Sequence, residues 1–316
     1  MNLNKPLRIE VLILTLNDVE DTKECLKCYN EIKNRNLDLN INLIDNGSDS
    51  IYAEQLSRIC EKLDINYIRN KTNLGFAPAL AKVLPLINKH YDYLLLSNND
   101  IVFDCIQLEQ FIFQSYRNKS SISSPVITYY PNTDIIWQEG GYVNRMFLHL
   151  RMPMKNKRLS EIKNLAPREV DFVSGCIMLI SHDHIEKAGF LDSTFFYSVE
   201  DLDYCLRVSP EDKILIIPDS VIHHKVASTS GGWNSFFSVY HNVLGRTYLS
   251  TKQHNFIKIC SFLYLIFIFI PVKAWKVRKT RNVFSVLPIL YKSSIKIWFK
   301  SSTCRPRYIK NLLYPK

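Results

Sequence analysis

Glycine is scarce in this sequence, with nine residues in 316. No two of them fall in a G-x-G-x-x-G pattern, and G-x-x-x-x-G-K is also missing. These absences exclude a standard dinucleotide fingerprint and a Walker A phosphate loop. With 47% hydrophobic and 22% charged residues, the remaining composition is that of a globular chain and excludes collagen and bulk disorder.

Acidic residues are missing from the last third of the chain. Residues 220–316 hold 16 basic residues and no acidic ones, whereas residues 1–219 hold 24 basic and 30 acidic residues. Ile259–Val272 in the basic part reads ICSFLYLIFIFIPV, without a charge. Anionic membrane surfaces attract segments that are both apolar and cationic. We therefore expect residues 247–316 to form a basic, amphipathic, membrane-associating helical region.

Three interpretations of the apolar run are open. It lies in the membrane interface, it crosses the bilayer, or it packs in a core or against a partner. A span needs about 20 apolar residues, so this run is short, and the missing acids weigh against a core helix. We favour the interface, where the aromatic rings of Trp275, Trp298, Tyr291 and Tyr308 suit the level of the headgroups. We expect no N-terminal signal peptide, because residues 1–7 are polar.

Strand-like and helix-like segments alternate in the first hundred residues. Apolar runs predict strands, and longer mixed segments between them predict helices, at 9–14, 18–35, 41–44, 51–63, 66–69, 75–88 and 93–96. This alternation predicts a mainly parallel sheet with helices on both faces. Polar clusters follow three of the strands, at 15–17, 45–48 and 97–100. Ligands bind beyond the carboxyl ends of such strands, so the clusters predict one shared site.

Several patterns carry a family resemblance in their order along the chain. They are Thr15-x-Asn17, Asp45-Asn46-Gly47-Ser48, Asn73-x-Gly75-Phe76-Ala77, Asn98-Asn99-Asp100, Gly189-Phe190-Leu191-Asp192, Glu200-Asp201-x-Asp203-x-Cys205-x-Arg207 and a Val-x-x-His ending at His224. Together they resemble glycosyltransferase family 2, and within it bacterial rhamnosyltransferase-type enzymes of surface polysaccharide synthesis. The resemblance implies the α/β GT-A fold, a Rossmann-like mixed sheet flanked by helices, in residues 1–246. The basic C-terminal helices lie outside it.

The resemblance also implies an activity. A sugar, rhamnose or a hexose, would pass with inversion from a nucleotide-diphosphosugar to a polyprenyl-linked saccharide in O-antigen, capsule or cell-wall polysaccharide synthesis. The protein would be peripheral, at the cytoplasmic face of the inner membrane, and would bind an anionic membrane surface and no nucleic acid. The sugar, the linkage and the oligomeric state stay open.

Asp201 is the expected catalytic base, because the family places its base in the Glu200-Asp201 pair. An acceptor hydroxyl attacks poorly while it is protonated, and a nearby carboxylate accelerates the step. Glu200 and Asp203 are expected to support it. The alternatives are that these acids favour a helix N-terminus and that Asp203 pairs with Arg207 one turn away on the helix surface.

Negative charge grows on the diphosphate during transfer, so a divalent cation (Mg²⁺ or Mn²⁺) or fixed donors must face it. Asp100 is one expected metal ligand, since a carboxylate oxygen suits either ion. Relatives carry a D-x-D-like signature here, and Asn98-Asn99-Asp100 keeps only its last carboxylate. The resemblance makes His224 the second ligand, although the neighbouring His223 leaves that choice open.

Nine residues are expected to line the nucleotide-sugar site: Thr15, Asn17, Asp45, Asn73, Gly75, Asn98, Asn99, Ser174 and Gly175. Helix capping is the alternative for several of them, and an ordinary turn is the alternative for Asp45. The run Phe195–Tyr197 is expected to form core and one pocket wall. Relatives often carry an Arg-Asn pair where this chain has His241-Asn242, so Lys225 or Arg246 is a candidate contact for the diphosphate.

Two other classes of function compete with the enzyme. The incomplete D-x-D pattern is compatible with a non-catalytic nucleotide-sugar-binding or scaffold protein of a membrane assembly. The basic C-terminal third is compatible with nucleic-acid binding, but its apolar run has no role there. Metal-dependent transfer separates the first class from an enzyme, and binding that salt abolishes and lipid does not affect would indicate the second.

Overall fold

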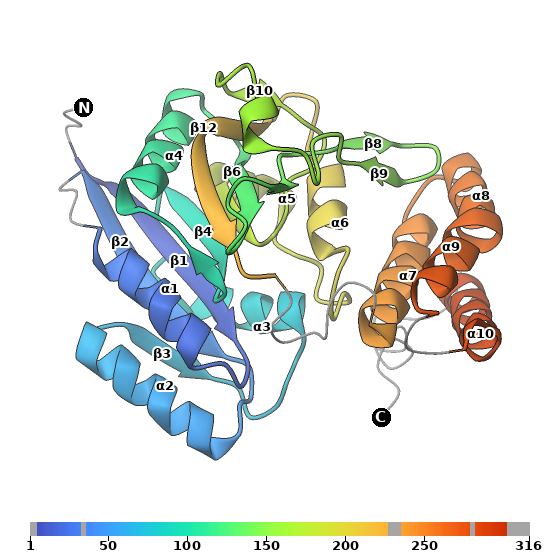
Figure 1. The fold of residues 1–316 in the computed structure, drawn as a ribbon, viewed down its shortest axis with the longest axis horizontal. Helices are drawn as coiled ribbons and strands as arrows, with labels where there is room; N and C mark the ends of the chain where they lie inside the picture. Colours follow the sequence, from blue (N-terminus) through green and yellow to red (C-terminus); the bar gives the residue numbers. More distant parts are fainter. Residues whose placement is uncertain (1–4, 33–35, 227–234, 279–281, 302–316) are drawn as a thin grey trace.

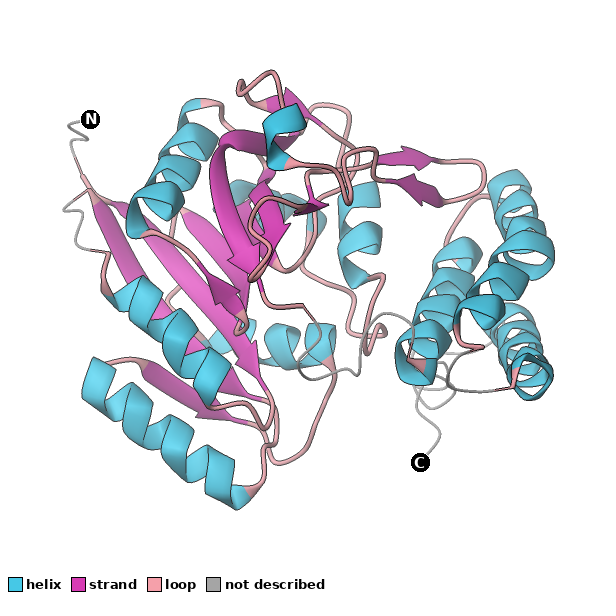
Figure 2. Cartoon of the chain, in the orientation of Figure 1, coloured by secondary structure: helices cyan, strands magenta, loops and turns pink. Residues whose placement is uncertain are grey.

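The structure, a computed structural model, describes residues 5–32, 36–226, 235–278 and 282–301 (Figure 1). In these residues a mixed sheet forms the centre, helices cover its faces, and a further group of helices packs at one end of the molecule. Figure 2 shows the same layers by type of element.

The strands are β1 (Leu7–Thr15), β2 (Leu37–Asp45), β3 (Asn66–Arg69), β4 (Tyr93–Asn98), β5 (Ile101–Val102), β6 (Ile122–Tyr129), β7 (Ile136–Gln138), β8 (Tyr142–Asn144), β9 (His149–Arg151), β10 (Arg168–Glu169), β11 (Ile177–Ser181) and β12 (Ile214–His224). The α-helices are α1 (Glu20–Asn30), α2 (Ser50–Leu63), α3 (Phe76–Val83), α4 (Cys105–Arg117), α5 (His182–Ala188), α6 (Glu200–Leu206), α7 (Phe236–Thr251), α8 (Asn255–Tyr264), α9 (Ile270–Lys276) and α10 (Val283–Ser301). The short turns η1 (Leu84–Leu86) and η2 (Leu159–Glu161) are 3-10 helical, and η3 (Leu265–Phe269) is π-helical.

The main sheet runs in the order β10-β12-β6-β11-β4-β1-β2-β3. Strands β1 to β4 pair in parallel, as the alternation predicted, and β11 then enters antiparallel between β4 and β6, which makes the sheet mixed. Thr15 pairs with Asp45, and Leu14 pairs with Asn98. The polar clusters after β1, β2 and β4 therefore meet at one edge of the sheet.

Side-chain alternation along the strands divides the core into two halves. In β1, Ile9, Val11 and Ile13 join the half that packs against α1, α2 and α4, whereas Leu12 joins the half that packs against α3, α5 and α6. The predicted helices are shorter than expected at their ends. α1 stops at Asn30, and α3 passes into η1 at Leu84, just before Pro85.

The C-terminal helices form a third core around α7, built from α7, η3, α9 and α10 (Figure 1). The apolar run lies inside one continuous helical segment, Asn255–Lys276, which is long and apolar enough to cross a membrane by length and composition, with 17% of its most apolar window buried. The π-helical turn η3 ends directly before α9. Pro271, the second residue of α9, has no amide hydrogen to donate to this turn. The division expected after residue 246 falls inside α7, while Tyr308 lies outside the described residues.

The β8–β9 hairpin connects the sheet domain to these helices (Figure 1). The hydroxyl of Tyr264 in α8 lies 2.6 Å from Nδ1 of His149 in β9. Arg246 in α7 donates from Nη1 to the carbonyl of Leu148 at 2.7 Å. The hairpin thus closes one side of the space between α6 and the C-terminal helices.

Candidate functional site

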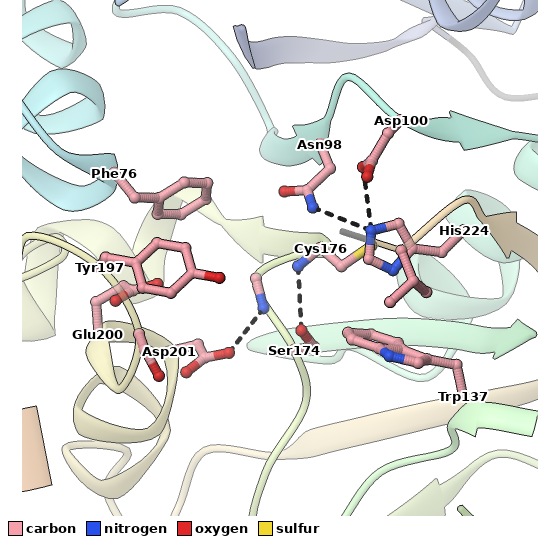
Figure 3. A pocket seen from close by; sticks show the side chains of 13 residues that line it. Phe76, Asn98, Asp100, Trp137, Ser174, Cys176, Tyr197, Glu200, Asp201 and His224 are labelled. Atoms are coloured by element: carbon pink, nitrogen blue, oxygen red, sulfur yellow. Dashed lines mark hydrogen bonds and ion pairs between the residues drawn. The ribbon is translucent and has the colours of Figure 1, made fainter. Parts of the chain in front are cut away.

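Three adjoining cavities lie beyond the carboxyl ends of β1 and β4. The central cavity, of about 180 Å³, is lined by Phe76, Asn98, Asp100, Trp137, Ser174, Gly175, Cys176, Tyr197, Ser198, Glu200, Asp201, His224 and Val226. In Figure 3, Asp100 and His224 lie on one side of it, and Glu200 and Asp201 lie on the other. Carboxylates more than 100 positions apart in the sequence therefore face a single cavity.

The other two cavities share walls with the central one. The strand-end cavity, of about 340 Å³, shares Phe76, Asn98, Asp100 and Tyr197 with it. The helical cavity, of about 500 Å³, instead shares Trp137, Ser174, Ser198 and Asp201. The helical cavity extends to α7, η3 and α9. A ligand that extends from the strand-end cavity into the helical cavity passes Asp100 first and Asp201 second.

Asp100 and His224 form the acidic and imidazole pair of the central cavity. Nε2 of His224 lies 3.0 Å from Oδ1 of Asp100 and 3.4 Å from the amide nitrogen of Asn98. The 3.0 Å contact lacks hydrogen-bond alignment, and within the described residues Oδ1 of Asp100 and Nδ1 of His224 are buried without a hydrogen-bond partner. His223 contacts Thr128 instead, with 2.7 Å between Nδ1 and the hydroxyl, and lines none of the three cavities.

This pair fits a divalent cation as a partial ligand set. A carboxylate oxygen and an imidazole nitrogen are both accepted ligands of divalent metals, and the unsatisfied oxygen of Asp100 faces the ring nitrogen. No group of three or more His, Cys, Asp or Glu side chains is placed to hold a metal in the part of the chain that the structure describes. A cation at Asp100 and His224 would therefore need further oxygens from its ligand or from water.

Asp201 is held by backbone hydrogen bonds at the start of α6. Its Oδ2 accepts from the amide of Gly175 at 3.2 Å, and its Oδ1 accepts from the amide of Leu202 at 2.8 Å. Burial raises the pKa of Asp201 above its ordinary value, and burial together with the charge of Asp201 raises the pKa of Glu200. Desolvation makes a carboxylate more basic, so Asp201 is suited to accept a proton.

A strained turn aims Asp201 into the cavity. Ser198 and Val199, directly before α6, both have positive φ, +69° and +77°. A β-branched residue in this region is an outlier, and such residues cost about 1–3 kcal/mol each. Helix α7 holds the turn in place, because Asn242 donates to the hydroxyl of Ser198 at 2.8 Å. Gly245 lets α7 approach, since a Cβ there would lie 3.1 Å from Cβ of Val199.

Asp203 has a different role from its neighbour. It is buried, lines none of the three cavities, and pairs with Arg207 at 3.2 Å and with Lys252 at 2.5 Å. Lys252 at the end of α7 also reaches Asp192 at 3.0 Å. The pairing of Asp203 with Arg207 matches the alternative considered from the sequence, but it occurs in the interior and not on the helix surface. Asp203 fastens α6 to α7.

The strand-end cavity holds most of the expected nucleotide-binding residues. Thr15, Asn73, Gly75, Asn98 and Asn99 line it. The side-chain Oδ1 of Asn73 accepts from the backbone amide of Gly75 at 2.9 Å. Gly75 has φ +87°, and a Cβ there would lie 2.5 Å from the carbonyl of Phe196, so this position requires glycine. Asn99 donates to Thr15 at 3.4 Å. The polar wall is thus preorganised by its own hydrogen bonds.

Asp45 and Asn17 line none of the three cavities. The Asp45 carboxylate accepts from the amide of Ser48 at 2.8 Å and from the Tyr67 hydroxyl at 2.6 Å, and it pairs with Arg69 at 3.4 Å. The Asn17 amide donates to Ser48 at 2.9 Å. Asn17 thus fastens the loop after β1 to the loop after β2, and Asp45 holds the loop after β2 to β3. These are the local alternatives, and a nucleotide contact for either residue stays a prediction.

The Ser174-Gly175 element lies beneath the central cavity, directly before β11. Ser174 accepts from the amide of Cys176 at 3.2 Å and lines both the central and the helical cavity. A Cβ atom added to Gly175 would lie 3.6 Å from its nearest neighbour, Cε1 of Phe76. The small residues thus leave the space between Phe76 and Asp201 open.

Several lining residues were missed from the sequence. Trp137 packs edge-on against His224, with 4.7 Å between ring centroids, but nothing in its sequence neighbourhood marks it. Lys155, Lys273 and Lys276 line the helical cavity. The excess of basic residues after position 219 hinted at Lys273 and Lys276, and nothing marked Lys155. Lys225, a candidate diphosphate contact, is held by ion pairs to Asp21 and Glu24, each at 2.6 Å.

Comparison with known proteins adds a family and a fold. The family model for glycosyl transferase family 2 matches residues 10–189, which is more than half of the chain. The structure is similar to GalNAc-T7 with UDP, GalNAc and Mn²⁺, at a TM-score of 0.64 and 14% identity, over 99% of this chain and 59% of that one. No curated protein matches the sequence.

Two further solved structures are similar. The mannosyltransferase PcManGT from Pyrobaculum calidifontis, in complex with GDP-Man and Mn²⁺, has a TM-score of 0.57 and 12% identity, over 98% of this chain and 86% of that one. S. aureus TarS has a TM-score of 0.53 and 13% identity, over 92% of this chain and 54% of that one. The chain thus spans only 59% of GalNAc-T7 and 54% of TarS. At such identities the similarity shows the fold, and the GT-A-like α/β fold predicted from the sequence is confirmed.

Proposed function

The chain belongs to glycosyl transferase family 2, and on that premise we propose that it transfers a sugar, with inversion, from a nucleotide-diphosphosugar to a lipid-linked saccharide. The observation that carries the proposal is the convergence of Asp100, His224 and Asp201 on one cavity. The cation ligands and the base stand on opposite sides of this cavity (Figure 3), as attack opposite a leaving group requires.

The donor is assigned to the strand-end and central cavities. Thr15, Asn73 and Asn99 provide polar groups for the nucleoside, and Gly75 allows close approach of the backbone. The diphosphate would lie beside Asp100, which follows β4 and is one of the residues that both cavities share. GalNAc-T7 and PcManGT were solved with UDP and with GDP-Man, and this supports a nucleotide sugar here without identifying the base or the sugar.

Asp100 and His224 would hold a divalent cation. The same two solved structures contain Mn²⁺, and the donor set suits Mn²⁺ or Mg²⁺ with diphosphate oxygens completing it. When bound, such a cation supplies neutralisation of the charge that grows on the leaving diphosphate. The side-chain amide nitrogen of Asn98 lies 3.4 Å from Nε2 of His224, so Asn98 borders the proposed cation position.

Asp201 would accept the proton of the acceptor hydroxyl. The hydroxyl oxygen forms a bond to the anomeric carbon as the bond from that carbon to the diphosphate breaks, and the electron pair leaves with the nucleoside diphosphate. Hydrogen bonds from Gly175 and Leu202 fix the carboxylate, and burial raises its pKa, which favours proton transfer to it. The charge of Asp201, together with burial, raises the pKa of the neighbouring Glu200, and Asp203 positions α6 through Lys252.

The C-terminal helices would place the site at an anionic membrane surface. They expose large apolar side chains on α8, η3, α9 and α10: Phe256, Ile259, Leu263, Phe267, Ile268, Val272, Trp275, Phe284, Ile289, Ile295 and Phe299. Residues 220–316 add basic charge and no acids. Exposed apolar surface next to cations is typical of proteins that bind anionic bilayers. The acceptor would therefore be lipid-linked, and the protein would meet it at the cytoplasmic face. The sugar would be rhamnose or a hexose, and the product would serve surface polysaccharide synthesis.

The test is a panel of nucleotide sugars with the full chain, Mn²⁺ or Mg²⁺, and a polyprenyl-linked saccharide in vesicles. We expect one donor to support metal-dependent transfer. Asp201→Asn should lower the turnover about 10²–10⁴-fold and leave the donor dissociation constant unchanged. Asp64→Asn is the matched control, because Asp64 is exposed at the end of α2 with φ +56°, where asparagine fits.

Two outcomes would contradict this proposal. Full turnover by Asp201→Asn would remove Asp201 from the mechanism. Tight donor binding with no transfer to any acceptor, in the wild type, would favour the non-catalytic scaffold.

A further inference from the structure

The helical cavity brings four cations together from three parts of the chain. Lys155 lies after β9, Arg246 in α7, and Lys273 and Lys276 in α9. Burial and the neighbouring cations lower the pKa of Lys273 to about 8, and burial with the charge of Lys276 lowers the pKa of Lys155. Burial lowers the pKa of Arg246 to about 10. The fold holds these charges against desolvation and mutual repulsion.

Within the described residues, Arg246, Lys273 and Lys276 form no ion pair with a carboxylate. The Nε of Arg246 is buried and has no hydrogen-bond partner. Other partly buried lysines of this chain are paired, as Lys225 and Lys252 each contact two carboxylates. Buried charge is costly unless it is paired, so the helical cavity has the electrostatics of an anion site.

Apolar side chains line the helical cavity beside these cations, and Arg246 and Lys273 both lie over the ring of Phe269. Among these apolar residues are Ile268, Phe269 and Val272, from η3 and α9. Ile268 and Val272 are also about half exposed, at 52% and 51%, so the cavity opens on the apolar surface of the C-terminal helices. Cations inside and apolar side chains at the mouth fit a ligand that joins an anionic group to a hydrocarbon chain.

We propose that the helical cavity binds the diphosphate of the lipid-linked acceptor, with its lipid chain leaving along η3 and α9 and its saccharide hydroxyl reaching Asp201. This inference rests on the proposed function. Asp201 lines both the helical and the central cavity, so an acceptor held there meets the donor at the base. Asp100 and His224 do not line the helical cavity, which separates this diphosphate from that of the donor.

The first experiment measures binding directly and needs no transfer. The probe is a short-chain prenyl diphosphate without a sugar, titrated into the full chain while tryptophan fluorescence is recorded, since Trp137 lines the cavity. Lys273→Met should raise the dissociation constant about tenfold or more, the effect of losing one charge-assisted contact. Lys292→Met, which removes an exposed lysine of α10 outside the cavity, should change it less than about twofold.

The second experiment measures transfer twice, first with the acceptor varied at saturating donor and then with the donor varied at saturating acceptor. Lys273→Met should raise KM for the lipid-linked acceptor about tenfold and leave KM for the donor unchanged, while the prenyl diphosphate competes with the acceptor and not with the donor. The same variant should unfold no more easily than the wild type, because it removes a cation that repels its neighbours.

The results separate this inference from the proposed function. Wild-type transfer with an unchanged acceptor KM in Lys273→Met, together with unchanged prenyl diphosphate binding, would overturn the inference alone. Equal loss of binding to phosphatidylglycerol vesicles that contain no diphosphate would assign the cations to lipid headgroups and overturn it as well. Selective loss of prenyl diphosphate binding would support it even if no donor of the panel were transferred.

Discussion

The strand-end cavity and the helical cavity lie on either side of the central one and differ in how their polar groups are satisfied. In the strand-end cavity, Asn46 donates to Asn73 at 2.9 Å and Asn99 donates to Asp18 at 3.0 Å. The side chains there complete one another before any ligand arrives. In the helical cavity the cations face one another, and Asp201 is the one carboxylate among its described lining residues.

In our proposal, this difference keeps two substrates of like charge apart. A preorganised polar wall recognises shape and hydrogen bonds, and in our proposal its cation arrives with the donor. An uncompensated basic cavity recognises charge, so it suits an anionic acceptor that diffuses in the membrane plane. Asp201 lies where the central cavity meets the helical cavity, and our mechanism requires the proton of the acceptor hydroxyl to move there.

Among substitutions other than that of Asp201, replacing Asp100 should have the largest effect, and the effect should fall on the donor side alone. Asp100→Asn removes the carboxylate proposed to hold the cation, and we expect turnover to fall about 10²–10³-fold. When transfer is titrated with Mn²⁺, the variant should need a higher Mn²⁺ concentration for half-maximal activity. Its affinity for the prenyl diphosphate should stay unchanged. Asp104→Asn is the control, since asparagine also caps α4. An unchanged Mn²⁺ titration for Asp100→Asn would separate Asp100 from metal binding.

Breaking the buried ion pairs of Asp203, which fasten α6 to α7, should have the next largest effect. Asp203→Ala leaves Lys252 and Arg207 without one partner each, and we expect a loss of about 3 kcal/mol in the free energy of unfolding, measured by denaturant titration. This is the lower end for a buried pair, because Lys252 keeps Asp192. Glu54→Ala, which removes an exposed pair with Arg58 on α2, should cost no more than about 1 kcal/mol. Similar costs for both variants would contradict the linking role.

Polar substitution on the apolar helix should weaken membrane binding without unfolding the protein. The Phe267 side chain is 72% exposed on η3, and burying a phenylalanine in lipid contributes about 1.5–3 kcal/mol. Phe267→Ser should therefore lower sedimentation with anionic vesicles about tenfold. Ile51→Ser is the matched control, as Ile51 is 65% exposed on α2. Equal vesicle binding by all three proteins would contradict the proposed membrane surface.

The smallest expected effect is a change in the pH profile. Because burial raises the pKa of Asp201, the acidic limb of kcat/KM for the acceptor should lie above the ordinary aspartate value of about 3.9, and activity is lost as pH falls through it. Asp201 is faced by Glu200 on α6, by Arg246 on α7 and by the amide of Gly175. A limb at the ordinary value would contradict a desolvated base.

The basic limb should come from the helical cavity. Arg246, Lys276 and Lys155 face Lys273 and, with burial, lower its pKa to about 8, so acceptor affinity should fall as pH rises through that value. Lys273→Arg should move this limb upward, because a guanidinium stays charged. The measurement is kcat/KM for the acceptor between neutral and alkaline pH. An unmoved limb would show that another group titrates there.

Much of the strand-end cavity followed from the sequence, because its polar wall depends on neighbours along the chain. The polar clusters after β1, β2 and β4 meet because parallel strands align their ends. The preference for His224 over His223 came from the family resemblance and not from strand alternation. β12 shifts register between Ile217 and Val221, so Ile216 and Ile222 lie on opposite faces despite their even spacing. A β-bulge of this kind reverses the alternation that a sequence pattern assumes.

The sequence by itself determined the order of the elements, the family patterns and the separation of a mixed first part from a basic, apolar last third. These are properties of composition and short-range spacing, which the chain carries before it folds. Only the tertiary structure decided that Asp203 is an interior ion pair, that Asn17 and Asp45 fasten loops, and that α7 holds the strained turn before Asp201. It also gathered Lys155 with Lys273, because contacts between residues that are far apart in the chain depend on packing and not on local pattern.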